Sequence, residues 1–125
     1  MTQGFPVLAF ALLKIAVPMV LMPSLSTPSE ITLLAKLSNF THLFVSSKLF
    51  SLGLAAAKEM GLAEDRVIIL HGHVSGRRSL EDLANHVVSY NIPRVAPQPV
   101  HDNSLAYMVF SSGTTGLPKG ALHPF

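Results

Sequence analysis

The 125-residue sequence contains no cysteine. That absence excludes scaffolds held by disulfides, metal sites built from thiolates and cysteine nucleophiles. Charged residues are also scarce, at 13% of the chain, and the formal net charge is only +2. So small a charge, scattered along the sequence, does not indicate a nucleic-acid partner, although the pI is about 9.2.

Hydrophobic residues, by contrast, make up 49% of the chain, which excludes a disordered polypeptide. The length is that of one ordinary domain and is too short for two well-buried ones. A mean hydropathy of +0.44 leaves two explanations. Either the chain contacts a membrane, or further protein covers its core.

The apolar run from Phe5 to Leu25 is long enough to cross a bilayer. Lys14 near its middle and three prolines oppose a span, because a charge in the bilayer is costly and proline interrupts a helix. Residues 1–5 carry no basic side chain of the kind that begins a secretory signal. We therefore expect a helix over 6–15, a buried strand over 17–22, and an intracellular, cytoplasmic protein.

The next segments alternate between helix and strand patterns. Thr27-Pro28-Ser29-Glu30 is a capping box that predicts a helix ending near Asn39. A strand over 43–46, a helix over 48–60 and a strand over 67–70 have the length and order of a βαβ unit. Gly61 is the expected C-cap of the middle helix, with Leu62 folding back on it. The predicted buried face of that helix consists of Leu49, Leu52, Ala56 and Met60.

Ser79, followed by Asp82, predicts another short helix. Its expected inner side carries Leu80, Leu83, Ala84 and Val87. Prolines are frequent in residues 91–104, which we expect to form an extended connector. A strand-like run over 105–110 then leads into a Gly-rich loop. This alternation predicts the α/β fold class with a largely parallel sheet.

The candidate functional residues of the sequence lie in the loop over residues 111–120. Its order is Ser111-Ser112-Gly113-Thr114-Thr115-Gly116-Leu117-Pro118-Lys119-Gly120. Glycines allow tight turns that present backbone N–H groups, hydroxyls add short donors, and Lys119 adds positive charge, so the loop fits a polyphosphate. It is not a Walker A loop, because Pro118 stands where that pattern needs glycine. For a generic loop of this composition, the alternative is an exposed turn between two strands.

The segment from Tyr107 to Gly120 resembles the phosphate-binding motif of the adenylate-forming superfamily. That superfamily contains acyl- and aryl-CoA synthetases, adenylation domains of nonribosomal peptide synthetases, and luciferases. Residues 12–23 resemble a segment of the superfamily in which a helix leads into a strand through Lys, Ala-Gly-Ala, Val and Pro. Residues 27–30 stand where members of the superfamily often have Thr-Pro-Glu-Glu. The resemblance implies that residues 1–125 are an incomplete N-terminal adenylation domain. Its expected fold is a partial Rossmann-like or flavodoxin-like subdomain.

The same resemblance implies roles for the loop. Contacts to the ATP phosphates would come from Ser111, Ser112, Gly113, Thr114, Thr115 and Gly116. Lys119 would be the catalytic residue, neutralising charge on the β- and γ-phosphates as pyrophosphate leaves. ATP and Mg²⁺ are the implied cofactors, a carboxylic acid is the substrate, and coenzyme A or a carrier thiol is the acceptor. The implied function is that of an ATP-dependent acid–thiol ligase, or alternatively of an adenylation domain in a nonribosomal-peptide-synthetase-like protein.

The 125 residues contain none of the superfamily's downstream motifs, such as Tyr-Gly-x-Thr-Glu with its magnesium-binding glutamate. We therefore expect a fragment without ligase turnover. His123 receives no role, because it matches one variant of the motif while Phe125 stands where many members have histidine. Two hypotheses without catalysis stay open, namely a small membrane-associated protein anchored by residues 5–25 and a nucleotide-binding module.

The remaining histidines are expected to be structural or solvated. His71 and His73 could ligate a metal, but no third ligand lies nearby in the sequence, so we expect a surface turn and no metal site. His42, His86 and His101 are isolated.

Overall fold

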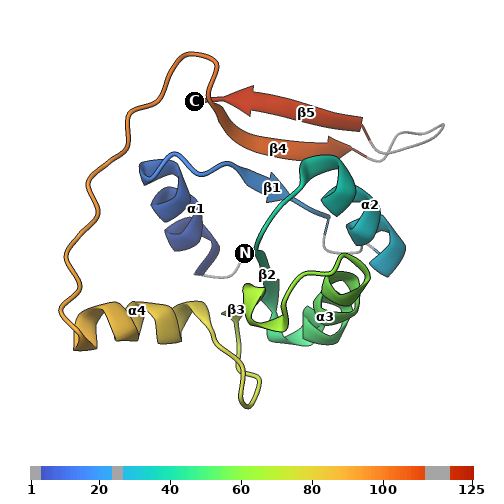
Figure 1. Cartoon of the computed structure of the whole chain (residues 1–125), viewed down its shortest axis with the longest axis horizontal. Helices are drawn as coiled ribbons and strands as arrows, with labels where there is room; N and C mark the ends of the chain where they lie inside the picture. The colour runs from blue at the N-terminus through green and yellow to red at the C-terminus, as the bar shows by residue number, and fades with distance from the viewer. Residues whose placement is uncertain (1–3, 24–26, 112–118) are drawn as a thin grey trace. The chain divides into compact units, whose positions relative to one another are not determined.

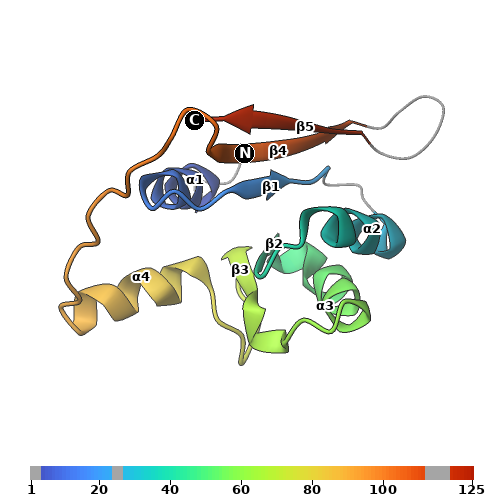
Figure 2. The same cartoon turned by 45° about the horizontal axis from the view of Figure 1, so that its top comes forward.

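The computed structural model describes residues 4–23, 27–111 and 119–125. The chain divides into two compact units, one made of Met1–Phe5 with Thr27–Arg94 and the other of Pro6–Ser26 with Val95–Phe125. Figures 1 and 2 show their helices and strands. Each unit contains a pair of parallel strands accompanied by helices, which confirms the predicted α/β class.

The first unit is built around the predicted βαβ arrangement. Its elements are α2 (Pro28–Ser38), β2 (Leu43–Ser46), η1 (Ser47–Leu49), α3 (Phe50–Glu59), η2 (Glu64–Arg66), β3 (Val67–His71) and α4 (Leu80–Ser89). β2 and β3 pair in parallel, and α3 connects them, as predicted. In Figure 1, α2 lies beside α3, and the two helices pack on each other.

The predicted capping box at Thr27 and the predicted cap at Ser79 are both present, and the second is also a capping box. The Glu30 N–H donates to Oγ1 of Thr27 at 3.3 Å, and the Thr27 N–H donates to the Glu30 carboxylate at 2.6 Å. Ser79 and Asp82 form the same reciprocal pair at the start of α4, with distances of 3.1 and 2.8 Å. Each box satisfies amide groups that have no partner inside the helix. Bonds from the backbone and hydroxyl of Thr27 lower the pKa of Glu30, and those from the hydroxyl and backbone of Ser79 lower the pKa of Asp82.

The end of α3 also follows the prediction. Gly61 adopts a φ of +68°, in the left-handed region that glycine tolerates best. The Leu62 N–H turns back to the carbonyl of Ala57 at 2.8 Å, and the Gly61 N–H donates to the carbonyl of Lys58 at 3.1 Å. This pair of bonds is a Schellman motif, and it satisfies carbonyls that the helix leaves unpaired.

The predicted buried face of α3 is largely wrong. The residues that are buried are Phe50, Gly53, Ala56 and Ala57, whereas Leu49, Leu52 and Met60 are only half-buried. Small residues face the strands, which lets the helix approach them so closely that a β-carbon at Gly53 would lie 2.9 Å from Cγ1 of Val45. The core of the unit consists of Phe50, Ala57, Val67 and Ile69.

α4 is less covered than its pattern predicts. Leu80 and Leu83 are half-buried, but Ala84 and Val87 are exposed, so the predicted inner side is wrong for its second half. The helix contacts β3, and within the helix only Leu80 and Leu83 are half-buried. Beyond it, residues 92–101 form neither helix nor strand.

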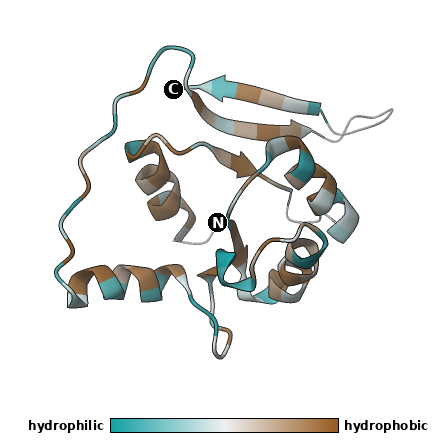
Figure 3. Cartoon of the chain, viewed as in Figure 1, coloured by the Kyte–Doolittle hydropathy of each residue, from teal (hydrophilic) through white to brown (hydrophobic). Residues whose placement is uncertain are grey.

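The second unit contains α1 (Gly4–Lys14) from Pro6 onward, β1 (Met19–Leu21), β4 (Leu105–Ser111) and β5 (Lys119–Pro124). The long apolar run is thus divided between a helix and a short strand, as predicted, and Figure 3 shows that both are mostly hydrophobic. Within the described ranges, no helix has the length and apolar character needed to cross a membrane. The sheet has the order β1-β4-β5, in which β1 runs parallel to β4 and β5 runs antiparallel to it. β5 was not predicted from the sequence.

Candidate functional site

The candidate phosphate-binding loop joins two antiparallel strands. β4 ends at Ser111, β5 begins at Lys119, and these two residues stand opposite each other in the register. The other predicted contacts, Ser112, Gly113, Thr114, Thr115 and Gly116, lie outside the described residues. The structure therefore brings together a hydroxyl and an ammonium group at the base of the loop. Figure 2 shows the two strands side by side.

The two faces of this hairpin differ in character. Side chains alternate across a strand, so Tyr107, Val109 and Ser111 share one face of β4. Ala106 and Phe110 point to the opposite face, where they are buried at 3% and 7% exposure. One face of β4 is thus packed, while the other ends in the exposed Ser111. The buried side chains support the strand, and on the other face the half-buried Tyr107 and Val109 lead to the exposed Ser111.

Ser111 and Lys119 are both free to meet a ligand. Each residue is exposed, and neither side chain forms a hydrogen bond or ion pair with another of the described residues. A lysine ammonium offers three hydrogen-bond donors and a positive charge, and a serine hydroxyl offers one more donor. Bonds from charged donors to phosphate oxygens are among the stronger ones in proteins. This donor set fits a polyphosphate.

One feature of the hairpin was missed in the sequence. The rings of Tyr107 and His123 stack across the two strands, with centroids 4.6 Å apart and an angle of 14° between their planes. The two residues lie equally far from the middle of the loop, as do Ser111 and Lys119. If β5 had been predicted, this symmetry about the loop would have indicated that Tyr107 and His123 are paired.

Other polar clusters serve the packing of the first unit. The Arg77 guanidinium lies 2.9 Å from the Glu64 carboxylate and 5.3 Å from the centre of the Phe50 ring, and it is the main cause of the lowered pKa of Glu64. The rings of His86 and Tyr90 contact each other at a tilt of 38°, with centroids 4.5 Å apart. In the part of the chain that the structure describes, no three histidine or acidic side chains come together as ligands for a cation.

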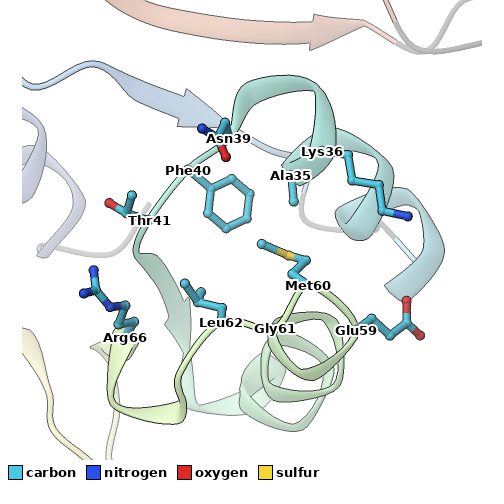
Figure 4. A pocket seen from close by; sticks show the side chains of 10 residues that line it. All are labelled: Ala35, Lys36, Asn39, Phe40, Thr41, Glu59, Met60, Gly61, Leu62 and Arg66. Carbon is cyan, nitrogen blue, oxygen red and sulfur yellow. The ribbon is translucent and has the colours of Figure 1, made fainter.

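The first unit also has a pocket of about 470 Å³ near the C-terminal ends of α2 and α3. Figure 4 shows Phe40, Met60 and Leu62 in its middle, with the charged ends of Lys36 and Glu59 pointing away. The Glu59 carboxylate already accepts a hydrogen bond from the Thr32 hydroxyl at 2.8 Å. The pocket offers an apolar floor rather than a set of groups that could act on a substrate.

Curated proteins match short segments of this chain. The carboxylic acid reductase of Mycobacterium marinum is 37% identical over 57 residues, covering 41% of this chain and 5% of the reductase. N-benzoylphenylalaninol synthetase apmA of Penicillium brevicompactum is 53% identical over 32 residues, covering 26% of this chain and 1% of the synthetase. The chain therefore spans only a small part of the curated relatives that it matches.

The fold comparison covers nearly the whole chain. A red-emitting luciferase from Phrixothrix hirtus superposes with a TM-score of 0.81 over 98% of this chain and 24% of the luciferase, at 22% identity. At that identity the similarity establishes the fold alone. The family of AMP-binding enzymes matches residues 1–125 in full. The chain therefore belongs to the AMP-binding enzyme family, whose members form adenylates.

Proposed function

We propose that this chain supplies the phosphate-binding part of an ATP-dependent ligase that joins a carboxylic acid to AMP and then transfers the acyl group to a thiol. The observation that carries the proposal is the pairing of Ser111 with Lys119 at the base of the loop, both exposed and both without a partner among the described residues. Family membership over residues 1–125 supports ATP as the nucleotide. The name of the carboxylic acid reductase supports a carboxylate substrate.

In this proposal, Lys119 acts electrostatically. Adenylation forms a bond between a carboxylate oxygen and the α-phosphorus and breaks the bond to pyrophosphate, which leaves with the electron pair. Negative charge therefore grows on the leaving oxygens, and a cation held in place stabilises it. Ser111, together with Ser112, Gly113, Thr114, Thr115 and Gly116, would supply neutral donors to the same phosphates.

Mg²⁺ would accompany the nucleotide rather than sit in a site of this hairpin. Magnesium prefers oxygen ligands, often phosphate oxygens with one or two carboxylates. Neither β4 nor β5 contains a carboxylate residue. We therefore assign the ion to the phosphate oxygens.

The thiol acceptor is proposed to be coenzyme A, with a carrier-protein thiol as the alternative. The alternative corresponds to an adenylation domain of the nonribosomal-peptide-synthetase type. We further propose that the 125-residue polypeptide alone has no ligase turnover, because it contains none of the superfamily's downstream motifs.

Calorimetric titration of the 125-residue chain with pyrophosphate and with MgATP tests the phosphate role. We expect Lys119→Ala to weaken binding by about 10- to 100-fold, since hydrogen bonds to charged groups contribute about 1.5–3 kcal/mol. Lys48→Ala is the matched control, because it removes one exposed lysine of the first unit. Lys119→Arg keeps the positive charge, so it should lose less affinity than Lys119→Ala.

Three outcomes separate the hypotheses. Equal binding by wild type and Lys119→Ala would overturn the phosphate role. Formation of acyl-AMP by the purified 125-residue chain, followed by exchange of labelled pyrophosphate into ATP, would overturn the proposed lack of turnover. Tight MgATP binding without exchange, even when the chain is part of a longer polypeptide, would instead favour a nucleotide-binding module.

A further inference from the structure

The position of Lys119 depends on the register in which β5 pairs with β4. All six residues of β5 are exposed, so burial in a core does not hold this strand in place. The backbone hydrogen bonds alone do not fix the register, because the bonding pattern of an antiparallel ladder repeats every two residues. A slip by two residues would preserve the bonding pattern and move Lys119 by about 7 Å along the strand. Something else must hold Lys119 opposite Ser111.

The Tyr107–His123 stack is the first contact that distinguishes the registers. Its rings lie 4.6 Å apart and nearly parallel, on the same face of the hairpin as Ser111 and Lys119. In one slipped register, Tyr107 would face Ala121, which has no ring, and the stack would be lost. Aromatic pairs contribute more stability than the area that they bury accounts for, so losing the stack opposes the slip.

The contact between Phe110 and Gly120 opposes the slip in the other direction. These residues are paired, and a β-carbon at Gly120 would lie 3.1 Å from Cε1 of the Phe110 ring. A side chain at position 120 would therefore crowd the buried ring, whereas glycine does not. In the other slipped register, Phe110 would face Leu122 rather than glycine.

We propose that His123 is a positioning residue, which through its stack on Tyr107, together with the Phe110–Gly120 contact, holds the hairpin in the register that places Lys119 opposite Ser111. The functional consequence rests on the proposed phosphate role of Lys119, whereas the register itself does not. This assigns His123 a role that depends on its ring rather than on its proton.

The test combines a structural and a binding readout on the full 125-residue chain. In His123→Ala, we expect cross-strand NOEs between the backbones of Val109 and Ala121 to weaken. Its pyrophosphate affinity should fall by about 3- to 10-fold, the range that an aromatic pair contributes. His123→Phe restores a ring and should keep both the NOEs and the affinity. His101→Ala, which removes an exposed imidazole outside the hairpin, is the control.

The two readouts make the failures distinguishable. Unchanged NOEs and unchanged affinity in His123→Ala would overturn the positioning role, even if Lys119→Ala weakens binding as expected. Loss of both in His123→Phe would also overturn it, because the ring would then not be sufficient. If Lys119→Ala binds pyrophosphate like wild type, the proposed function fails, and the NOEs of His123→Ala alone decide the register.

Discussion

Gly53 provides a sharp test of how the first unit is packed. Glycine inside a helix is unfavourable, and replacing it with alanine in α3 should stabilise the helix by about 1 kcal/mol on propensity alone. In this structure, however, a β-carbon at Gly53 would lie 2.9 Å from Cγ1 and 3.5 Å from Cγ2 of Val45, and 3.3 Å from Cδ2 of Leu43. The two effects have opposite signs, so their magnitudes decide the outcome.

The overlap is expected to win. A separation of 2.9 Å is well inside the ordinary carbon–carbon contact of about 3.5–4.0 Å. Val45 cannot easily yield, because its β-branched side chain is stiff and packs on the core of Phe50, Ala57, Val67 and Ile69. Overpacking of this kind costs about 1–3 kcal/mol, and the close contact places Gly53→Ala in the upper part of that range. After the helix gain is subtracted, we expect a net loss of about 1–2 kcal/mol.

Urea unfolding followed by far-UV circular dichroism measures this change, provided that the slope with denaturant is the same for each variant. Ala55→Gly is the matched control, because Ala55 is exposed in the same helix and reports propensity alone. The variant that combines Gly53→Ala with Val45→Ala should lose less free energy of unfolding than the sum of the two single losses, since the truncated side chain at position 45 relieves the overlap. If Gly53→Ala raises the free energy of unfolding, the close approach of α3 to β2 is refuted.

Two further predictions concern the helix ends. Gly61→Ala should lower the free energy of unfolding by about 1–2 kcal/mol, because Gly61 has a φ of +68° and its cost is backbone strain rather than crowding; an unchanged urea midpoint would contradict this. The pKa of Asp82 is lowered from 3.8 by the hydroxyl and backbone N–H of Ser79, so the stability that it contributes is present above pH 3.8 and is lost as the pH falls through the lower folded-state value. Wild type should therefore exceed Asp82→Asn in stability at pH 7 and lose that advantage as the pH falls below 3.8, and a difference independent of pH would exclude this linkage.

Local features of this fold were predictable from the sequence because they depend on neighbouring residues. The Thr27–Glu30 and Ser79–Asp82 capping boxes and the Gly61 C-cap each use side chains and amides within a few positions. The βαβ order of β2, α3 and β3 followed from alternating patterns of sufficient length. The loop over 111–120 was recognisable because its residue types and their order are specific.

The buried face of α3 could not be predicted in the same way. Periodicity favoured its large apolar residues, but the strands pack against Gly53, Ala56 and Ala57. Which side of a helix is covered depends on how near its neighbours approach, and small residues permit the nearest approach. The prediction for the second half of α4 failed for a related reason. An apolar pattern shows which side of a helix is able to pack, but not whether another element lies against it.

For the candidate site, the sequence by itself determined the residue types, since the run of hydroxyls, glycines and a lysine that suits phosphate can be read without a fold. Only the tertiary structure decided that Lys119 stands opposite Ser111 and that His123 stacks on Tyr107. Those relations depend on strand register, which is set by contacts between residues on either side of the loop. Donor types are a property of single residues, whereas register is a property of pairs that only the folded chain brings together.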